Sequence, residues 1–412
     1  MILKNTNKKD ILPFVFSFFA DFMFYYSFYV SLFAKNGFSG GKLATLFVIM
    51  NASKMIADIP VGIFADIISR RSVLIFGILF RCIFCALCLI GDNFYIFSIA
   101  MFFVGIGNSC IWTHNWNYFY DYKKELNDIA SFPKFMGKFY AISNIAIAFA
   151  GFTGTYVFKM LGFSGVFIGS IISMFVAIFV MLHLPNYKPQ TTLKTAISLK
   201  VSNPLHFLSL LKVLIKKPKI IRLLLLAILC DTMFIVSLDM NTTLMNMSSF
   251  RPELISQVVG FVAFIRIFSN YFSGRTEQFM KFKRMHSFLF LLMILSIGVS
   301  IKSSIWVIAS VSFYLCVYPF FDTSIKTKLE HKLDSNTRAT VMSLASLFVS
   351  ICAIIFNSLI GFVAEQNGYF ASPVCIFLVV ILVLFVIRNI TLFYRTDKNI
   401  RGLYFKLFNK RK

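Results

Sequence analysis

Five ionisable side chains are predicted to lie at mid-membrane depth in long apolar runs of this sequence. Two are carboxylates, Asp21 and Asp231, and three are cations, Lys54, Arg81 and Arg266. Charged groups are costly in apolar surroundings, so they usually pair with one another or face a water-filled cavity. A carboxylate in such a place can carry a proton, and an arginine can hold an anionic group. The five residues are therefore candidates for proton coupling and substrate binding, and structural ion pairing between helices is the alternative.

Further polar candidates lie close to these charges in the sequence. Asp58 follows Lys54 by one helical turn, so the two side chains either neutralise each other or contribute to the same binding site. His114 and Asn115 belong to an unusually polar and aromatic stretch, 112–117, near the end of an apolar run. Both are candidates for contact with a solute or a gate.

The cysteines predict packing rather than metal or disulfide chemistry. Cys82, Cys85 and Cys88 share one face of a helix, but no second cluster of ligands accompanies them. All eight cysteines lie inside apolar runs, which is not the pattern of an extracellular disulfide framework. We expect no metal site and no cofactor.

The elements that position these residues are predicted to be membrane-spanning helices. The 412 residues are 58% hydrophobic and 14% charged, with a mean hydropathy of +0.78, against about 45–50% and about 25% in soluble domains. This composition excludes a soluble enzyme and a receptor with one anchor, and unbroken apolar runs exclude an outer-membrane barrel. A span takes roughly 20 residues, and apolar stretches of about that length lie at 11–33, 43–65, 73–91, 94–117, 138–158, 164–184, 220–246, 255–274, 285–303, 305–325, 340–363 and 371–393.

The sequence thus predicts an all-α polytopic membrane protein with twelve transmembrane helices in two six-helix bundles. The bundles would cover 1–184 and 220–394, joined by a cytoplasmic linker, 185–219, with an interfacial amphipathic helix, and followed by a basic tail, 395–412. A faint repeat supports two halves, because an aromatic stretch ending in Asp121 closes the fourth span and another ending in Asp322 closes the tenth.

The basic residues predict the orientation of the spans. With a cytoplasmic N-terminus, 33 of the 41 lysines and arginines fall on the cytoplasmic side and five on the other side. This asymmetry is typical of multi-pass proteins, so both termini are expected in the cytoplasm. The net charge of +24 is then explained by topology and anionic lipid, and nucleic acid is not an expected partner.

A compact charge cluster closes the second span. Gly62 and Asp66 precede a short turn, and Arg70 and Arg71 follow it. Taken alone, the cluster could be an ordinary basic loop. It resembles the signature loop of the major facilitator superfamily, Gly-x-x-x-Asp-(Arg/Lys)-x-Gly-Arg-(Arg/Lys), and departs from it at Ile67 and Ser69.

The resemblance extends over both halves. The stretch 58–66 is similar to the Glu-Ile-Pro-Thr-Gly-x-x-Ala-Asp motif of a bacterial branch of that superfamily. Tyr120-Asp121 at the end of span four, 338–344 at the start of span eleven and 361–365 near its end resemble the same branch.

The resemblance implies a rocker-type secondary transporter in a bacterial cytoplasmic membrane. Asp66 would latch the two halves together on the cytoplasmic side, supported by Gly62, Arg70 and Arg71, with Arg338 as the partner surface. The protein would be a monomer and not an enzyme, with a small-molecule substrate and membrane lipid as its partners.

The expected function is secondary active transport of a small organic solute by alternating access, driven by a proton gradient. Asp21 or Asp231 would couple the proton, and Arg81 and Arg266 would bind an anionic group. A drug or metabolite efflux antiporter of the same fold and a non-transporting sensor remain alternatives. A membrane transferase using His114 and Asp121 is disfavoured, because nothing else in the sequence indicates acyl or phosphate chemistry.

Overall fold

The computed structural model describes residues 11–187, 218–279, 304–330 and 335–367, and within them the secondary structure is helical without strands. The predicted ninth and twelfth spans, the amphipathic helix of the linker and the basic tail lie outside the described residues. The helices are α1 (Leu12–Asp21), α2 (Tyr25–Lys35), α3 (Gly40–Ile67), α4 (Arg70–Ile90), α5 (Phe94–Glu125), the short 3-10 helix η2 (Ile129–Ser131), α6 (Phe132–His183), α9 (Pro218–Met247), α10 (Pro252–Phe279), α12 (Ser304–Glu330) and α13 (Ser335–Asn367).

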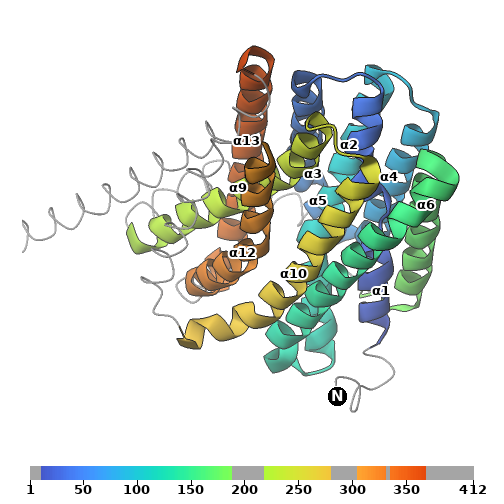
Figure 1. The fold of residues 1–412 in the computed structure, drawn as a ribbon. Coiled ribbons are helices and arrows are strands. Elements are labelled where there is room, and N and C mark those ends of the chain that lie inside the picture. Colours follow the sequence, from blue (N-terminus) through green and yellow to red (C-terminus); the bar gives the residue numbers. More distant parts are fainter. Residues whose placement is uncertain (1–10, 188–217, 280–303, 331–334, 368–412) are drawn as a thin grey trace, which may run out of the picture.

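The fifth and sixth predicted spans are present as one helical element, α6. Its 52 residues would extend far beyond the roughly 30 Å apolar core of a bilayer as a straight helix. Gly162 interrupts it with φ 65° and ψ −157°, a conformation open essentially to glycine alone. Figure 1 shows α6 turning back near the top of the view. The chain thus crosses twice, as the sequence predicts.

The first predicted span, in contrast, is broken. α1 ends at Asp21 and α2 begins at Tyr25. Two serines of α6 bond to backbone groups beside the break: Ser170 Oγ accepts from the Tyr25 amide at 2.9 Å, and Ser173 Oγ donates to the Phe19 carbonyl at 2.8 Å. Irregular backbone at membrane depth is tolerated where protein groups satisfy it, so these serines make the break possible.

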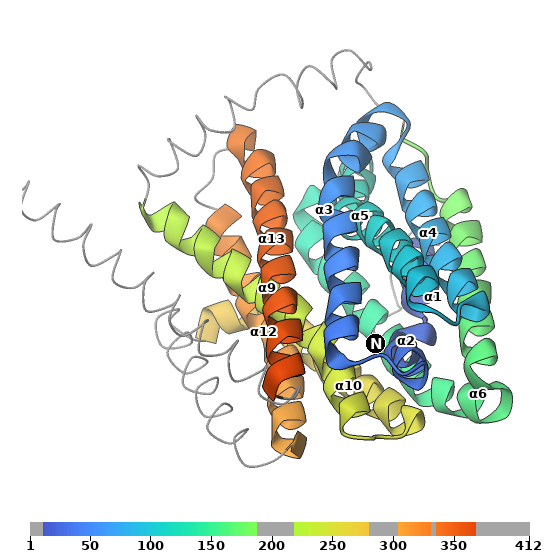
Figure 2. The same ribbon diagram turned by 90° about the horizontal axis from the view of Figure 1, so that it is seen from above.

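The two halves have separate hydrophobic cores. One core is built from α1 to α6, and the other from α9, α10, α12 and α13. Tyr26 and Met247 pack against both cores and therefore lie where the halves meet. In Figure 2 the helices of the second half lie to one side of those of the first.

The halves join mainly through two helix pairs, α6 with α10 and α3 with α13, and α2 and α3 also contact α9. We call the end that carries the connections 36–39, 91–93 and 248–251 the upper end, as in Figure 1, and the end that carries 68–69 and 126–131 the lower end. The predicted topology places the upper end outside the cell.

The contact between α6 and α10 is close enough to require glycine. A Cβ on Gly151 would come within 2.6 Å of the Gly260 Cα atom. Ser256 Oγ donates to the Gly151 carbonyl at 2.7 Å, and Thr155 Oγ1 donates to the Glu253 carbonyl at 3.2 Å. These hydrogen bonds lie toward the upper end, so the halves are held together there.

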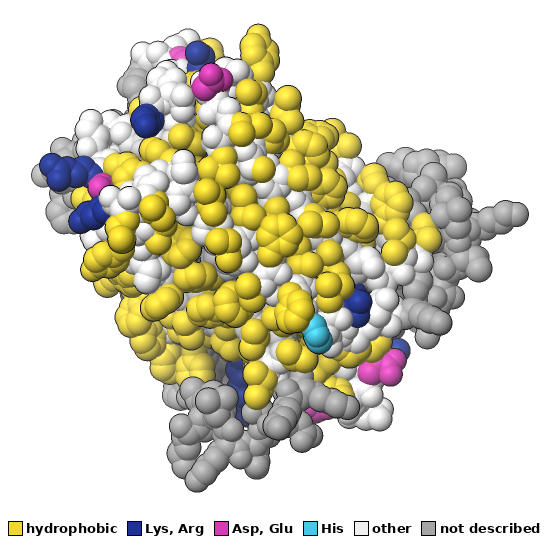
Figure 3. All heavy atoms as spheres, turned by 90° about the vertical axis from the view of Figure 1, so that its right-hand side faces the viewer, with side chains coloured by type: hydrophobic (Ala, Val, Ile, Leu, Met, Phe, Trp, Pro, Cys, Tyr) yellow, Lys and Arg dark blue, Asp and Glu magenta, His cyan; other side chains and the backbone are white. Residues whose placement is uncertain are grey.

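The outer surface fits a bilayer. Figure 3 shows a face covered by hydrophobic side chains, with the charged ones near its edges. Eight helical segments are long and apolar enough to cross a membrane, counted over the described residues alone. The second part of α6 exposes large apolar side chains along its length, Ile168, Ile172, Phe175, Phe179 and Leu182.

The conformation of Gly162 leads to a prediction about stability. Gly162→Ala should destabilise the protein by about 1–3 kcal/mol, because alanine is strained at this φ and ψ. Thermal unfolding in detergent measures the effect. Gly137→Ala is the matched control, since Gly137 is helical and open space surrounds its Cβ position. Equal melting temperatures for the two variants would contradict the prediction.

Candidate functional site

A buried ion pair lies at the break in the first span. Arg81 Nη1 of α4 lies 3.8 Å from Asp21 Oδ1, the last residue of α1. The side chain of Arg81 is 5% exposed and that of Asp21 is 23% exposed. Asp21 lies directly before the break, where its side chain reaches Arg81. The structure thus pairs two residues for which the sequence predicted separate roles.

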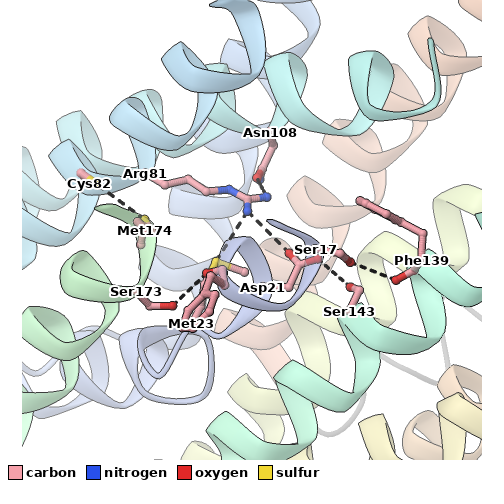
Figure 4. Close-up of polar contacts among 11 residues, drawn as sticks. Ser17, Asp21, Met23, Arg81, Cys82, Asn108, Phe139, Ser143, Ser173 and Met174 are labelled. Atoms are coloured by element: carbon pink, nitrogen blue, oxygen red, sulfur yellow. Dashed lines mark hydrogen bonds and ion pairs between the residues drawn. The ribbon is translucent and has the colours of Figure 1, made fainter. Parts of the chain in front are cut away.

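Neighbouring polar groups fix the geometry of this pair, as Figure 4 shows. Ser143 Oγ of α6 donates to Asp21 Oδ2 at 2.6 Å. Arg81 Nη2 donates to Asn108 Oδ1 of α5 at 3.0 Å, and Arg81 Nη1 approaches the Met23 sulfur at 3.5 Å. Arg81 Nε has no hydrogen-bond partner among the described residues. The guanidinium thus keeps donor capacity for a further acceptor.

A second cation, Arg266 of α10, comes from the other half. Its guanidinium carbon lies 5.0 Å from the ring centroid of Phe234, which stacks on Tyr318 with centroids 4.0 Å apart. Tyr318 Oη donates to Asp231 Oδ1 at 2.7 Å. Arg266 forms no ion pair with any residue that the structure describes, and its Nε is buried without a hydrogen bond. It interacts electrostatically with Asp21 across the boundary between the halves.

The proposed substrate residues of α3 and α5 form a different group. Lys54 Nζ lies 5.1 Å from the Trp112 ring, and Ser109 Oγ donates to Asp58 Oδ1 at 2.5 Å. Lys54 and Asp58 attract each other electrostatically, as their spacing predicts. His114 and Asn115 are buried on α5. These contacts join α3 to α5.

One carboxylate that sequence reasoning missed is Asp239 of α9. It is 5% exposed and accepts a hydrogen bond from Asn357 Nδ2 of α13 at 3.5 Å. Asn51 of α3, in the first half, lies close enough to interact with it as well. The available signal was an acidic residue late in the seventh predicted span, in Leu238-Asp239-Met240.

The signature loop holds the lower end of the first half together. Arg70 forms an ion pair with Asp121 of α5 and donates to the Asn117 carbonyl at 3.1 Å. Arg71 donates to the Leu184 carbonyl at 2.7 Å. The side chains of Asp66 and Arg338 lie outside what the structure describes, so the latch between them stays a prediction.

Two serines support the connections at this end. Ser69, which stands where the signature has glycine, has extended backbone and caps α4 by accepting from the Ser72 amide at 3.1 Å. In the 126–131 connection, the Ser131 hydroxyl and the Lys123 ammonium hold the pKa of Asp128 below its usual value.

The fold and the loop agree with a known family. The sequence profile of the Major Facilitator Superfamily matches residues 11–357. The chain belongs to this superfamily, and it is a multi-pass membrane protein of the transporter type. No curated protein sequence matches it.

Solved transporter structures share the fold. They include a point mutant of the nucleoside transporter NupG (TM-score 0.67, 14% identity, covering 93% of this chain and 99% of that one). A POT family transporter in complex with 5-aminolevulinic acid has a TM-score of 0.70 and 14% identity. The match covers 94% of this chain and 96% of that one. A D-xylose-proton symporter has a TM-score of 0.67 and 12% identity, and the match covers 90% of this chain and 96% of that one. Identities this low establish the common fold alone.

The ion pair at the break leads to a second prediction. Asp21→Asn should destabilise the protein by about 3 kcal/mol, because it leaves Arg81 as an uncompensated buried charge. The double variant Asp21→Asn/Arg81→Met should recover most of that loss, since the charge is then gone as well. Thermal unfolding in detergent compares the two with Asp92→Asn, a change at an exposed carboxylate. A double variant less stable than Asp21→Asn would show that the two residues do not act as a pair.

Proposed function

We propose that this protein is a proton-coupled secondary transporter of a small organic solute that carries an anionic group. The observation that carries the proposal is the balance of charge where the halves meet. Asp21 is paired with Arg81, whereas Arg266 has no carboxylate partner among the described residues. The three residues together bear one net positive charge, which a carboxylate or phosphate group of a solute would neutralise.

The two arginines come from different halves, Arg81 from α4 and Arg266 from α10. A solute that contacts both would bridge the halves, as a transporter that alternates between two openings requires. Beside Arg266, the stacked rings of Phe234 and Tyr318 offer an apolar surface for the rest of the solute. The similar structures involve solutes of different chemical classes, a nucleoside, 5-aminolevulinic acid and D-xylose, so the anionic group is inferred from the charges of this chain alone.

Asp21 supplies a route for proton coupling. The anionic group of the solute would replace the Asp21 carboxylate as partner of Arg81, whose Nη1 reaches Asp21 at 3.8 Å. Asp21, then without its cation, would take up a proton, which removes an otherwise uncompensated charge. Asp231 is the second coupling candidate, although its hydrogen bond from Tyr318 gives it a partner that the solute does not displace directly.

The contacts at the upper end indicate which state of the transport cycle the structure represents. The described hydrogen bonds between the halves, from Thr155 to the Glu253 carbonyl and from Ser256 to the Gly151 carbonyl, lie toward that end. With the orientation predicted from the basic residues, the structure would be closed to the outside. The latch of Asp66 to Arg338 would then form in the opposite state, when the lower end closes.

Solute-induced proton flux in proteoliposomes tests the proposal. Pools of organic anions and zwitterions should move protons, and pools of neutral sugars and organic cations should not. Proton movement with the solute indicates symport, and movement against it indicates an efflux antiporter. Proton flux with cationic drugs alone would overturn the anionic assignment. Absence of proton flux with every pool, together with specific solute binding to the folded protein, would favour a non-transporting sensor.

The third prediction concerns Arg266. Arg266→Gln should raise the KM for the active anionic solute by roughly 10–100-fold, since a hydrogen bond to a charged group contributes about 1.5–3 kcal/mol. Initial uptake rates over a range of solute concentrations measure the change. Arg251→Gln removes an exposed arginine at the upper end and should leave the KM unchanged. An unchanged KM in Arg266→Gln would exclude this residue from the binding site.

A further inference from the structure

Asp239 is a buried carboxylate at the boundary between the halves, and the proposed transport cycle above does not use it. It lies toward the upper end of α9, and its side chain meets two asparagines from different halves. Asn357 of α13 belongs to its own half, and Asn51 of α3 belongs to the other. Asn51 and Asn357 are themselves buried. The three side chains form a polar contact that connects the halves inside an apolar surrounding.

No lysine or arginine that the structure describes forms an ion pair with Asp239, whereas Asp21 has Arg81 as partner. From α2, the Tyr26 hydroxyl lies close enough to interact electrostatically with it. No hydrogen bond that the described residues of α10 or α12 make reaches it, and Asp231, on the same helix, bonds to Tyr318 instead. Arg266 of α10 acts on the same Tyr26 hydroxyl but forms no ion pair with Asp239, so the described groups that interact with this carboxylate, Tyr26 and the two asparagines, are neutral.

The burial of Asp239 depends on closure of the upper end. Asn51 and Asn357 belong to α3 and α13, which pack against each other across the halves. A Cβ on Gly361 of α13 would come within 2.9 Å of the Ala44 Cβ atom of α3, so these helices touch closely near this end. Separation of α3 from α13 would remove Asn51 and admit water to Asp239. The carboxyl group thus exchanges a dry surrounding for a wet one when the upper end opens.

We propose that Asp239 links proton binding to closure of the upper end, and that it holds a proton while this end is closed. A carboxylate without a cation is very costly in an apolar interior, whereas the neutral acid can donate to one asparagine and accept from the other. Opening hydrates the group and releases the proton to the side that has opened. The inference rests on the proposed proton-coupled transport and adds to it a residue that senses the state of the gate.

The sign of the pH dependence follows from this linkage. The closed state holds the proton, so a rise in pH favours the open state. The distance between spin labels on the two halves reports opening, and Lys159 of α6 and Leu254 of α10 are suitable positions because both are exposed at the upper end. The labels are attached to cysteines at these positions after the native cysteines are replaced. No solute is needed, so the result is independent of whether the transported solute has been found.

In the labelled parent protein, which keeps Asp239, the distance between the two spin labels should lengthen as the pH rises from about 5 to about 9. Asp239→Asn keeps a donor and an acceptor but cannot release a proton, so its distances should stay short over the whole range. Asp239→Glu should restore the pH dependence, and Asp92→Asn, at an exposed carboxylate of the same end, should leave it unchanged. A pH-dependent opening in Asp239→Asn equal to that of the parent protein would overturn the proposal.

A second variant tests the proposal if Asp239→Asn does not fold. Asn51→Ala removes the contact from the first half and leaves Asp239 able to titrate. The closed state is then less favoured, so opening should occur at lower pH than in the parent protein. An unchanged midpoint would show that this contact does not control the gate. Transport of a solute with a pH-independent upper end would overturn the inference about Asp239 and leave the proposed function standing.

Discussion

Everything in this structure depends on how charged side chains are accommodated inside an apolar helix bundle. Arg81 and Arg266 carry charges that are costly to expose to lipid, and each side chain faces the protein interior. Arg81 is compensated by Asp21, and Arg266 rests on an aromatic stack. In the proposed transporter, the charge of Arg266 constrains the solute that binds between the halves, because a cationic solute would be repelled by it.

The break in the first span determines the position of Asp21, the carboxylate that compensates Arg81. Asp21 ends α1 and lies next to the break, so its carboxylate reaches Arg81 and Ser143 together. Ser170 and Ser173 satisfy the backbone that the break exposes. The same principle operates at the boundary between the halves, where the asparagines around Asp239 provide hydrogen bonds in place of water. Polar groups from α6, α3 and α13 thus determine where charge is tolerated.

Sequence reasoning predicted much of this and failed at identifiable points. Apolar run lengths predicted all six spans of the first half and four of the second, because span length follows from bilayer thickness. The family resemblance is confirmed, and the electrostatic attraction between Lys54 and Asp58 follows from helix periodicity. The break after Asp21 could not be predicted, since the serines that stabilise it lie far away in the sequence. The cap at Ser69 and the partners of Asp239 depend in the same way on the folded backbone.

The most direct test of the central claim is the number of protons taken up when an anionic solute binds to the purified protein. Calorimetric titrations in buffers of different ionisation enthalpy, at neutral pH, measure this number. The displacement of Asp21 from Arg81 predicts uptake of close to one proton per solute bound, and almost none in Asp21→Asn. Binding of the anion without proton uptake would contradict the account, because the solute would then add its charge without replacing the carboxylate.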